Sequence, residues 1–300
     1  MSISLEGRTA VVTGAGRGIG RATALELARL GAAVVVNDIG TSHDGEGRDT
    51  SLAEGVVEEI RAAGGQAAVN VDSVSEFESA GKIIETARDQ FGGVDILVNN
   101  AGLASRAPIW EVDPETFDRV VASHLYGAFN CTRHVAPWMK QQGWGRIVNL
   151  VSRGGITGIV GVTSYGAGKG GIFGLTNVCA RDLAPFGVTV NGVNPSSTET
   201  RMVMRAVEAG RAKGGEAARQ AEGLMAVLQK PERVAVVIAA LCSDEAAAIN
   251  GEFFLVKGNE VGLFQPLTVT QSASREADWT PGDLVAALSK LELHPIDGPY

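Results

Sequence analysis

Short apolar runs, mostly of β-branched residues, alternate along the chain with longer segments in which apolar residues recur at a helical period. The runs are apolar at consecutive positions, which is typical of parallel strands covered by helices on both faces. The seven predicted strands span residues 9–14, 32–38, 66–72, 94–102, 145–152, 188–195 and 251–256. This alternation predicts an α/β fold: a doubly wound, seven-stranded parallel sheet flanked by helices, with right-handed crossovers.

Two regions depart from this alternation. The polar stretch at 39–50 is unusually long for a connection between a strand and a helix. The segment 261–300 ends in an amphipathic stretch at 280–293, where Pro281 suits the first turn of a helix. We therefore expect a single domain over 1–260 and a C-terminal extension over 261–300 that packs on the body or on a neighbouring subunit.

Composition excludes several classes of function. The 300 residues are 45% hydrophobic, enough for a large core, and carry a formal charge of −8, which argues against a nucleic-acid partner. No apolar run reaches the ~20 residues of a membrane span, and the N-terminus lacks a signal-peptide pattern. Neither the histidines nor Cys131, Cys179 and Cys242 have metal-ligand spacing. We expect a cytoplasmic protein with reduced thiols and no metal.

The stretch TGAGRGIG at 13–20 joins the first predicted strand to the first predicted helix. Glycines at 14, 18 and 20 let the backbone turn sharply and approach a ligand, and the helix N-terminus attracts a pyrophosphate. These features predict a Rossmann-like dinucleotide site that includes Arg17 and Ile19. The alternative is a tight turn without a ligand.

Asp38 ends the second predicted strand, roughly 20 residues beyond this turn. A carboxylate there accepts hydrogen bonds from an adenosine ribose and repels a 2′-phosphate, so NAD is favoured over NADP. Arg17 points the other way, because it could meet that phosphate. A capping or loop role is the alternative for Asp38.

Tyr165 and Lys169 stand one helical turn apart in SYGAGKGG, at 164–171. Each glycine in a helix interior costs roughly 1 kcal/mol relative to alanine, so local propensity favours a loop. Only a helix puts the two side chains on one face. There the ammonium would lower the pKa of the phenol, normally near 10, and make it a usable base. We therefore predict a helix.

These motifs together resemble the short-chain dehydrogenase/reductase family over residues 6–260. The resemblance rests on TGxxxGxG, on NNAG at 99–102, and on Ser152 standing thirteen residues before the tyrosine of YxxxK. It implies that Tyr165 is the general base or acid, that Ser152 binds the substrate oxygen, and that Lys169 holds the nicotinamide ribose. Taken singly, each residue has a structural explanation as an interface tyrosine, a solvated lysine or a turn serine.

The resemblance also carries over a set of cofactor-binding positions at the ends of later strands. The acid at the third strand meets adenine, the NNAG segment lines the ribose, and the segment after the sixth strand lies near the carboxamide and phosphates. In this chain these are Asp72, Ser73, Asn100, Ala101, Gly102, Pro195, Thr198 and Thr200. For NNAG a turn that braces the sheet is the alternative.

Two positions depart from the family pattern. His124 stands where an asparagine usually holds a relay water, and Ser196 stands where glycine usually follows the proline. A histidine can also hydrogen-bond a backbone group and a water, so we include His124 among the catalytic candidates. The alternative is a packed helix histidine with no role in proton transfer.

One branch of the family combines His124, the NDIG strand end and the long loop after it. The sequence is similar to bacterial 17β-hydroxysteroid dehydrogenases and to the dehydrogenase unit of peroxisomal multifunctional enzyme type 2. This implies an NAD-dependent oxidoreductase that interconverts a secondary alcohol and a ketone on a bulky hydrophobic substrate, a hydroxysteroid or 3-hydroxyacyl-CoA. The alternatives are an NADPH-dependent ketone reductase, a dehydrogenase with non-exchanging nicotinamide and, less favoured, a cofactor-binding regulator.

The segment 196–230 takes the family's substrate-loop position. Its apolar side chains either form a substrate wall or pack the loop on the body, and its cations either meet a CoA phosphate or face solvent. The apolar residues are Met202, Val203, Met204 and Val207, and the cations are Arg201, Arg205, Arg211, Lys213 and Arg219. By resemblance we expect a homodimer or homotetramer, with Gly170, Gly171 or Gly174 allowing close approach of a partner subunit.

Overall fold

The predicted sheet is present, with one strand more than expected. The computed structural model describes residues 3–42, 47–265 and 268–292. Its sheet has the order β3-β2-β1-β4-β5-β6-β7-β8. The strands are β1 (Thr9–Thr13), β2 (Ala33–Asn37), β3 (Ala67–Asn70), β4 (Ile96–Asn99), β5 (Gly145–Leu150), β6 (Val188–Pro195), β7 (Phe253–Lys257) and β8 (Glu260–Leu263).

The first seven strands pair in parallel, which confirms the doubly wound α/β fold. The eighth, β8, pairs antiparallel with β7. It follows β7 after a tight turn at Gly258, whose φ of +62° favours glycine. Its residues are mostly exposed, so it lacks the apolar run by which the other strands were recognised.

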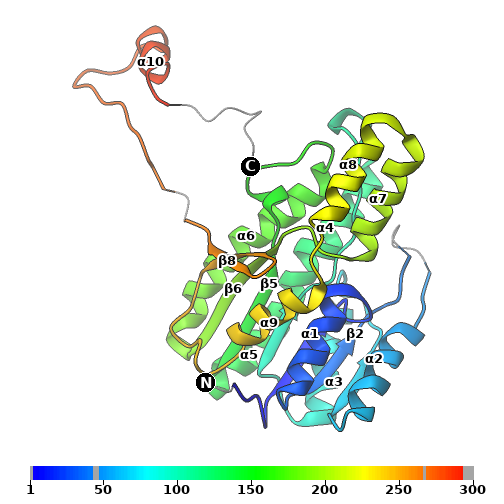
Figure 1. Cartoon of the computed structure of the whole chain (residues 1–300). Coiled ribbons are helices and arrows are strands. Elements are labelled where there is room, and N and C mark those ends of the chain that lie inside the picture. Colours follow the sequence, from blue (N-terminus) through cyan, green and yellow to red (C-terminus); the bar gives the residue numbers. More distant parts are fainter. Residues whose placement is uncertain (1–2, 43–46, 266–267, 293–300) are drawn as a thin grey trace. The chain divides into compact units, whose positions relative to one another are not determined.

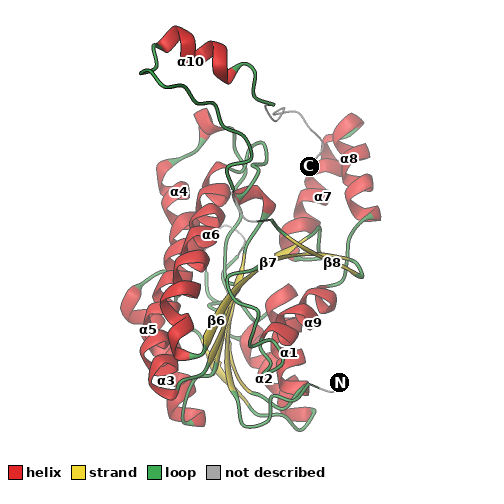
Figure 2. Ribbon diagram, turned by 90° about the vertical axis from the view of Figure 1, so that its left-hand side faces the viewer, coloured by secondary structure: helices red, strands yellow, loops and turns green. Residues whose placement is uncertain are grey.

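Helices cover both faces of the sheet (Figures 1 and 2). In Figure 2, α3, α4, α5 and α6 lie on one face and α1, α2 and α9 on the other. The α-helices are α1 (Gly18–Arg29), α2 (Ser51–Ala62), α3 (Phe77–Phe91), α4 (Pro114–Val121), α5 (Gly127–Gln142), α6 (Thr163–Leu183), α7 (Arg201–Lys213), α8 (Gly215–Ala226), α9 (Pro231–Leu241) and α10 (Pro281–Leu288). Shorter turns are the 3₁₀ helices η1 (Ile109–Glu111), η3 (Arg153–Gly155) and η4 (Ala184–Phe186), and the π-helix η2 (Ala122–Tyr126).

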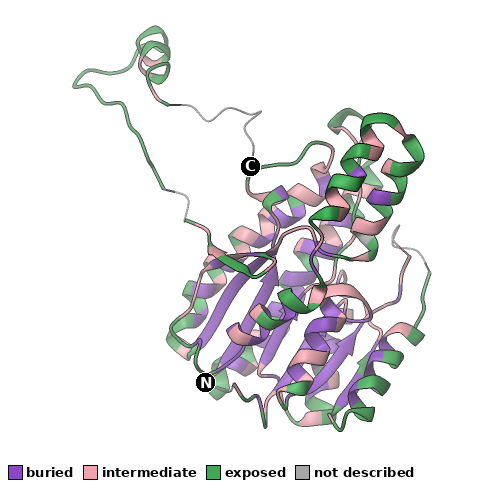
Figure 3. Ribbon diagram, in the orientation of Figure 1, coloured by how far each residue is buried: buried purple, intermediate pink, exposed green. Residues whose placement is uncertain are grey.

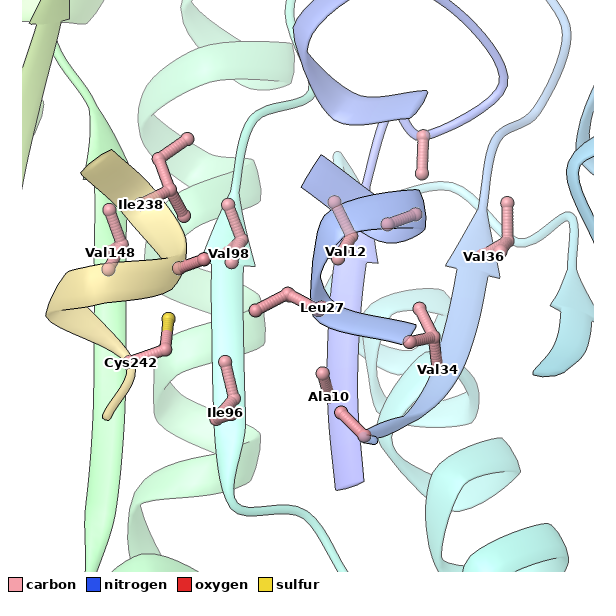
Figure 4. Packing of buried hydrophobic residues seen from close by; sticks show 14 of the residues in the cluster. Ala10, Val12, Leu27, Val34, Val36, Ile96, Val98, Val148, Ile238 and Cys242 are labelled. Carbon is pink, nitrogen blue, oxygen red and sulfur yellow. The ribbon is translucent and has the colours of Figure 1, made fainter. Parts of the chain in front are cut away.

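The strands are buried on both faces, as their continuous apolar runs predict (Figure 3). Neighbouring residues of β1 belong to opposite cores: Val12 packs beneath α1 and α9, and Val11 packs on the side of α3 and α5. Figure 4 shows Leu27 of α1 and Ile238 of α9 against the first of these faces. The two cores fix the sheet rigidly and leave its carboxyl edge to carry the loops.

The chain forms two compact units, one ending at Leu263 and one beginning at Phe264. Within the second, Thr280 caps α10 by accepting a hydrogen bond from the backbone N–H of Asp283. Asp283 also pairs with Arg275 at 2.7 Å. This helix begins where the amphipathic stretch 280–293 predicted one, and residues 293–300 lie outside the described part. No helix among the described residues has the length and apolarity to cross a bilayer.

Candidate active site

The glycine-rich turn between β1 and α1 has the shape of a phosphate cradle. Gly14 and Gly18 have φ of +63° and +54°, values that favour glycine. A Cβ at Gly20 would lie 2.2 Å from the carbonyl oxygen of Gly14, so only glycine fits there. No side chain caps α1 and no acid lies in its first turn, so its N–H groups face an anion site without competition. The turn therefore fits a dinucleotide pyrophosphate.

Arg17 and Ile19 have different positions in this turn. Arg17 is the extended residue immediately before α1, and its carbonyl accepts the first helical hydrogen bond, from Arg21. The side chain of Ile19 packs against the hydrophobic core beneath α1. Its side chain is partly buried there, and its backbone N–H lies in the first turn of α1.

Asn100 braces the turn from the end of β4. Its side-chain amide donates to the carbonyls of Thr13 and Gly14, both at 2.9 Å. The backbone amides of Asn100 and Ala101 both donate to the hydroxyl of Thr13, at 3.1 Å. The bracing role that we considered for NNAG thus accounts for the side chain of Asn100. The Asn100 amide braces the glycine turn from one side and leaves the opposite side of the turn free for a ligand.

Asp38 is fixed at the end of β2 by two backbone groups. The N–H of Gly16 donates to Oδ2 and the N–H of Gly40 donates to Oδ1, both at 2.8 Å. Each carboxylate oxygen keeps a further lone pair that can accept from a hydroxyl. The carboxylate therefore stands beside the glycine turn in the place where a ribose-binding acid is expected.

Asp72 and Ser73 follow β3 in a connected polar turn. Asn70 donates to Oδ2 of Asp72 at 2.9 Å, and the carbonyl of Asp72 accepts from Asn37 of the neighbouring strand at 2.9 Å. The backbone N–H of Ser73 donates to Ser79 at 2.9 Å. These bonds place both residues at the carboxyl edge of the sheet, as an adenine-contacting segment requires.

Tyr165 and Lys169 lie in α6, as predicted against local propensity. The ammonium of Lys169 is buried, donates to the carbonyl of Leu150, and lies 5.9 Å from the ring centre of Tyr165. Ser152 follows β5 and is hydrogen-bonded to Tyr165. The structure thus brings together all three residues that the sequence assigned to the reaction.

The lowered pKa expected for Tyr165 is not found in the chain alone. Burial raises the pKa of the phenol, and the hydrogen bond with Ser152 only partly opposes this. Burial also lowers the pKa of Lys169 to about 7, because the ammonium has left water. Packing thus disfavours both charged forms, and further positive charge is needed to produce a phenolate.

His124 is buried in the π-helical turn η2 and touches Tyr165. Its ring lies edge-on to Tyr165, with centroids 5.1 Å apart. Nε2 donates to the carbonyl of Leu103 at 2.7 Å, because that oxygen can only accept. In a neutral ring Nδ1 is then an acceptor, and it has no hydrogen-bond partner among the described residues. The pKa of His124 is lowered to about 3, mainly because the ring is buried and also because the positive charge of Lys169 lies nearby. The ring is therefore neutral.

Several glycines make room around these groups. A Cβ at Gly102 would lie 1.9 Å from Cε1 of His124, and one at Gly168 would lie 3.1 Å from its Cβ. A Cβ at Gly171 would lie 2.6 Å from the side chain of Leu125. Gly102 therefore has a packing role, beside the cofactor role assigned from the resemblance. Gly168, Gly170 and Gly171 of α6 therefore serve close packing inside this chain, whereas Gly174 has open space at its Cβ position.

The segment after β6 lies partly over the glycine turn. Pro195 ends β6 opposite Val256, and Thr200 caps α7 with its methyl group close to Gly18. Thr198 is buried instead, and its hydroxyl donates to the carbonyl of Ser196 at 2.8 Å. Thr200 is therefore better placed than Thr198 to touch a cofactor bound at the turn.

The expected substrate loop consists of the helices α7 and α8. Val207 is fully buried, which favours packing over a substrate wall for this residue, and the side chain of Met202 lies outside the described part. The cations of this segment are largely engaged with the chain itself. Arg211 pairs with Glu222, Arg219 pairs with Glu216, and Arg201 donates to the carbonyl of Thr41.

Sequence reasoning missed one residue that orders the site, Gly154. Its backbone N–H donates to Oγ of Ser152 at 3.1 Å, which occupies an acceptor position of that hydroxyl. The hydroxyl of Ser152 is therefore held between the backbone N–H of Gly154 and the phenol of Tyr165. The only signal in the sequence was the position of Gly154 two residues beyond the serine.

Comparison with known proteins agrees with this geometry. Residues 8–210 match the short chain dehydrogenase family. The hydroxyacyl-CoA dehydrogenase ChsB1 of Mycobacterium tuberculosis is 37% identical over 297 residues, covering 95% of this chain and 88% of the relative. The peroxisomal multifunctional enzyme type 2 of Drosophila melanogaster is 39% identical over 252 residues, covering 83% of this chain. This chain spans only 38% of that longer enzyme.

A solved structure has the same architecture over nearly its whole length. The crystal structure of a short chain dehydrogenase from Mycobacterium avium superposes with a TM-score of 0.80 at 37% identity, covering 96% of this chain and 97% of that one. The fold and the site define an NAD(P)-binding oxidoreductase that acts on CH–OH groups. The chain belongs to the short-chain dehydrogenase/reductase family, and the resemblance inferred from its motifs is confirmed.

The contact between Gly102 and His124 gives a first prediction. Gly102→Ala should lower the free energy of unfolding by about 1–3 kcal/mol, because its methyl group overlaps the imidazole. In a His124→Ala background the same change should have a smaller effect, since the ring is gone. Denaturant unfolding of the four proteins of this cycle measures the difference. Additive effects would show that the two residues do not compete for this space.

Proposed function

We propose that this protein is an NAD-dependent dehydrogenase that interconverts a secondary alcohol and a ketone on a bulky hydrophobic substrate. The observation that carries the proposal is the meeting of half-buried Ser152 and Tyr165 with buried Lys169 at the carboxyl edge of the sheet. The hydroxyacyl-CoA dehydrogenase named among the relatives supports a 3-hydroxyacyl-CoA. A steroid alcohol is the other candidate, and it rests on the resemblance inferred from the sequence motifs.

Each residue has a role that follows from its contacts. Ser152, held by the N–H of Gly154, donates to the substrate oxygen. Tyr165 removes the hydroxyl proton during oxidation and returns it during reduction. Lys169, anchored on Leu150, favours the phenolate and holds the nicotinamide ribose. A bound nicotinamide cofactor accepts or supplies the hydride.

His124 completes the site as a neutral positioning residue. Its ring supports one edge of Tyr165, and its Nε2–H fixes the ring on the carbonyl of Leu103. The unpartnered Nδ1 offers an acceptor for a water near the buried lysine. This is the relay function that a histidine in place of asparagine can retain.

The three cysteines bear on the compartment. All three cysteines of the chain are free thiols, and burial raises the pKa of Cys131 and of Cys242 to about 12. These unpaired thiols support a reducing compartment, and we propose the cytoplasm.

Tyr165→Phe should reduce kcat with a secondary alcohol by about 100-fold or more, because the proton acceptor is lost. Cofactor binding should persist, since the glycine turn is untouched. Steady-state NADH formation and fluorescence titration of NADH measure the two effects, and Glu54→Gln, an exposed residue of α2, is the control. Retained turnover in Tyr165→Phe would remove this residue from the mechanism.

Asp38→Asn should shift the ratio of the dissociation constants for NAD and NADP toward NADP by roughly tenfold or more, because a like charge facing the 2′-phosphate is removed. Titration of both cofactors measures the ratio, with Glu54→Gln on exposed α2 as the control.

The same titration separates the alternatives. Tighter binding of NADP by the unchanged protein would favour the NADPH-dependent reductase. Nicotinamide that stays bound through gel filtration would favour the non-exchanging dehydrogenase. The bond from Arg201 to the carbonyl of Thr41 supports the latter possibility, because it ties the long loop after β2 to the start of α7 beside the glycine turn.

We also propose that a second copy of this chain covers the face formed by α5 and α6. Large apolar side chains on a free surface favour association. Three such residues are exposed on this face: Tyr126, Phe129 and Val178. An open hollow of about 360 Å³ lies among Leu125, Tyr126, Phe129, Asn130 and Leu175. Gly174 has open space at its Cβ position, which leaves room for close approach of a partner helix.

Val178→Asp should therefore reduce the molar mass in solution by at least half, because a buried carboxylate would oppose the interface. Ala62→Asp, an exposed residue of α2, should leave the mass unchanged. Light scattering during gel filtration measures both. A monomeric unchanged protein, or a Val178→Asp protein of full mass, would contradict the proposed face.

A further inference from the structure

Two loops that leave the carboxyl edge of the sheet are joined beside the reacting residues. The loop after β4 and the loop after β5 meet in a short parallel bridge between Ala107 and Val162. The N–H of Ala107 donates to the carbonyl of Gly161 at 2.9 Å. This bridge ties residues 156–162, called the wall below, to the loop after β4.

Exposed apolar side chains gather on these two loops. Ile109 is 64% exposed and Trp110 is 81% exposed on the first, while Ile159 is 42% and Val160 is 89% exposed on the second. Four large apolar residues on these two joined loops would be unfavourable in water if nothing covered them. They suit the carbon skeleton of a hydrophobic substrate.

Gly154 stands where this wall meets the reacting groups. It is buried, and a Cβ built on it would lie 3.5 Å from Cδ1 of Ile159, Oγ of Ser152 and Cε1 of Tyr165. These are ordinary van der Waals distances, and the φ of Gly154 is not positive. Neither packing nor backbone conformation therefore requires glycine at this position.

The neighbouring glycine shows the contrast. A Cβ at Gly155 would lie 2.4 Å from the backbone nitrogen of Gly170, so packing alone excludes a side chain there. At Gly154 the fold accepts a methyl group, but that methyl would contact both Ser152 and Tyr165. The space left by Gly154 therefore borders the position that a substrate carbinol must reach.

We propose that Gly154 and Ile159 together set the size of the carbinol substituent that the site accepts. The inference rests on the proposed alcohol dehydrogenase function and adds its specificity. Gly154 leaves room beside the reacting hydroxyls, and Ile159 closes that room on its outer side. A bulky secondary alcohol needs this space, whereas a small one does not.

The test compares substrates of increasing size on matched variants. Gly154→Ala should lower the ratio of kcat/KM for a steroid or 3-hydroxyacyl-CoA alcohol to that for 2-butanol by roughly tenfold or more, because one methyl group fills the space. Ile159→Ala should raise the same ratio. The double variant should recover part of the loss, since the new methyl faces the space left by the isoleucine.

Gly55→Ala is the control, because Gly55 lies in α2 with open space around its Cβ position, and the ratio should not change. An equal loss of kcat/KM on every alcohol, or no change in the ratio, would overturn the inference while the dehydrogenase function stands. A merely structural effect on Ser152 gives the equal loss. An unchanged protein that oxidises no alcohol with NAD or NADP would instead refute the proposed function itself.

Discussion

The close packing of α6 against the segments that follow β4 and β5 is the constraint on which the site depends. A Cβ at Gly155 would lie 2.4 Å from the backbone of Gly170, and one at Gly171 would lie 2.6 Å from Leu125. Glycine in a helix interior costs roughly 1 kcal/mol relative to alanine. The contacts of the 21-residue helix α6 offset this cost. The close packing of α6 also brings Tyr165 within hydrogen-bonding reach of Ser152, two residues beyond the end of β5.

The same packing sets the charge of the site. Burial raises the pKa of Tyr165 and lowers those of Lys169 and His124, so packing disfavours the charged form of each group. The neutral phenol and the neutral imidazole accept an apolar alcohol without ions being removed from water, which would be unfavourable. Binding of a hydrophobic substrate and activation of the tyrosine are therefore separate requirements. The first follows from packing and the second needs additional positive charge.

The fold could be predicted because parallel strands buried on both faces leave a continuous apolar signal. The strand β8 leaves no such signal, since its four residues are largely exposed at the edge of the sheet. In the site, helical spacing predicted that Tyr165 and Lys169 share a face, and the family resemblance added Ser152. Spacing could not show that Asn100 turns its amide toward the glycine turn, because this depends on the side-chain contacts of two distant strand ends.

Two neighbouring glycines show why the remaining details of the site could not be predicted from the sequence. Gly154 and Gly155 are adjacent and identical in the sequence, yet a Cβ at one meets only ordinary contacts and a Cβ at the other overlaps α6. The difference arises because the Cα–Cβ bonds of the two positions would point in different directions from the same 3₁₀ turn. Packing within the chain excludes a side chain at Gly155. At Gly154 the chain leaves room for a methyl group, and only a bound substrate would compete with it for that room. Substrate preference can therefore change at this position without a change in the fold or in the residues that move the proton.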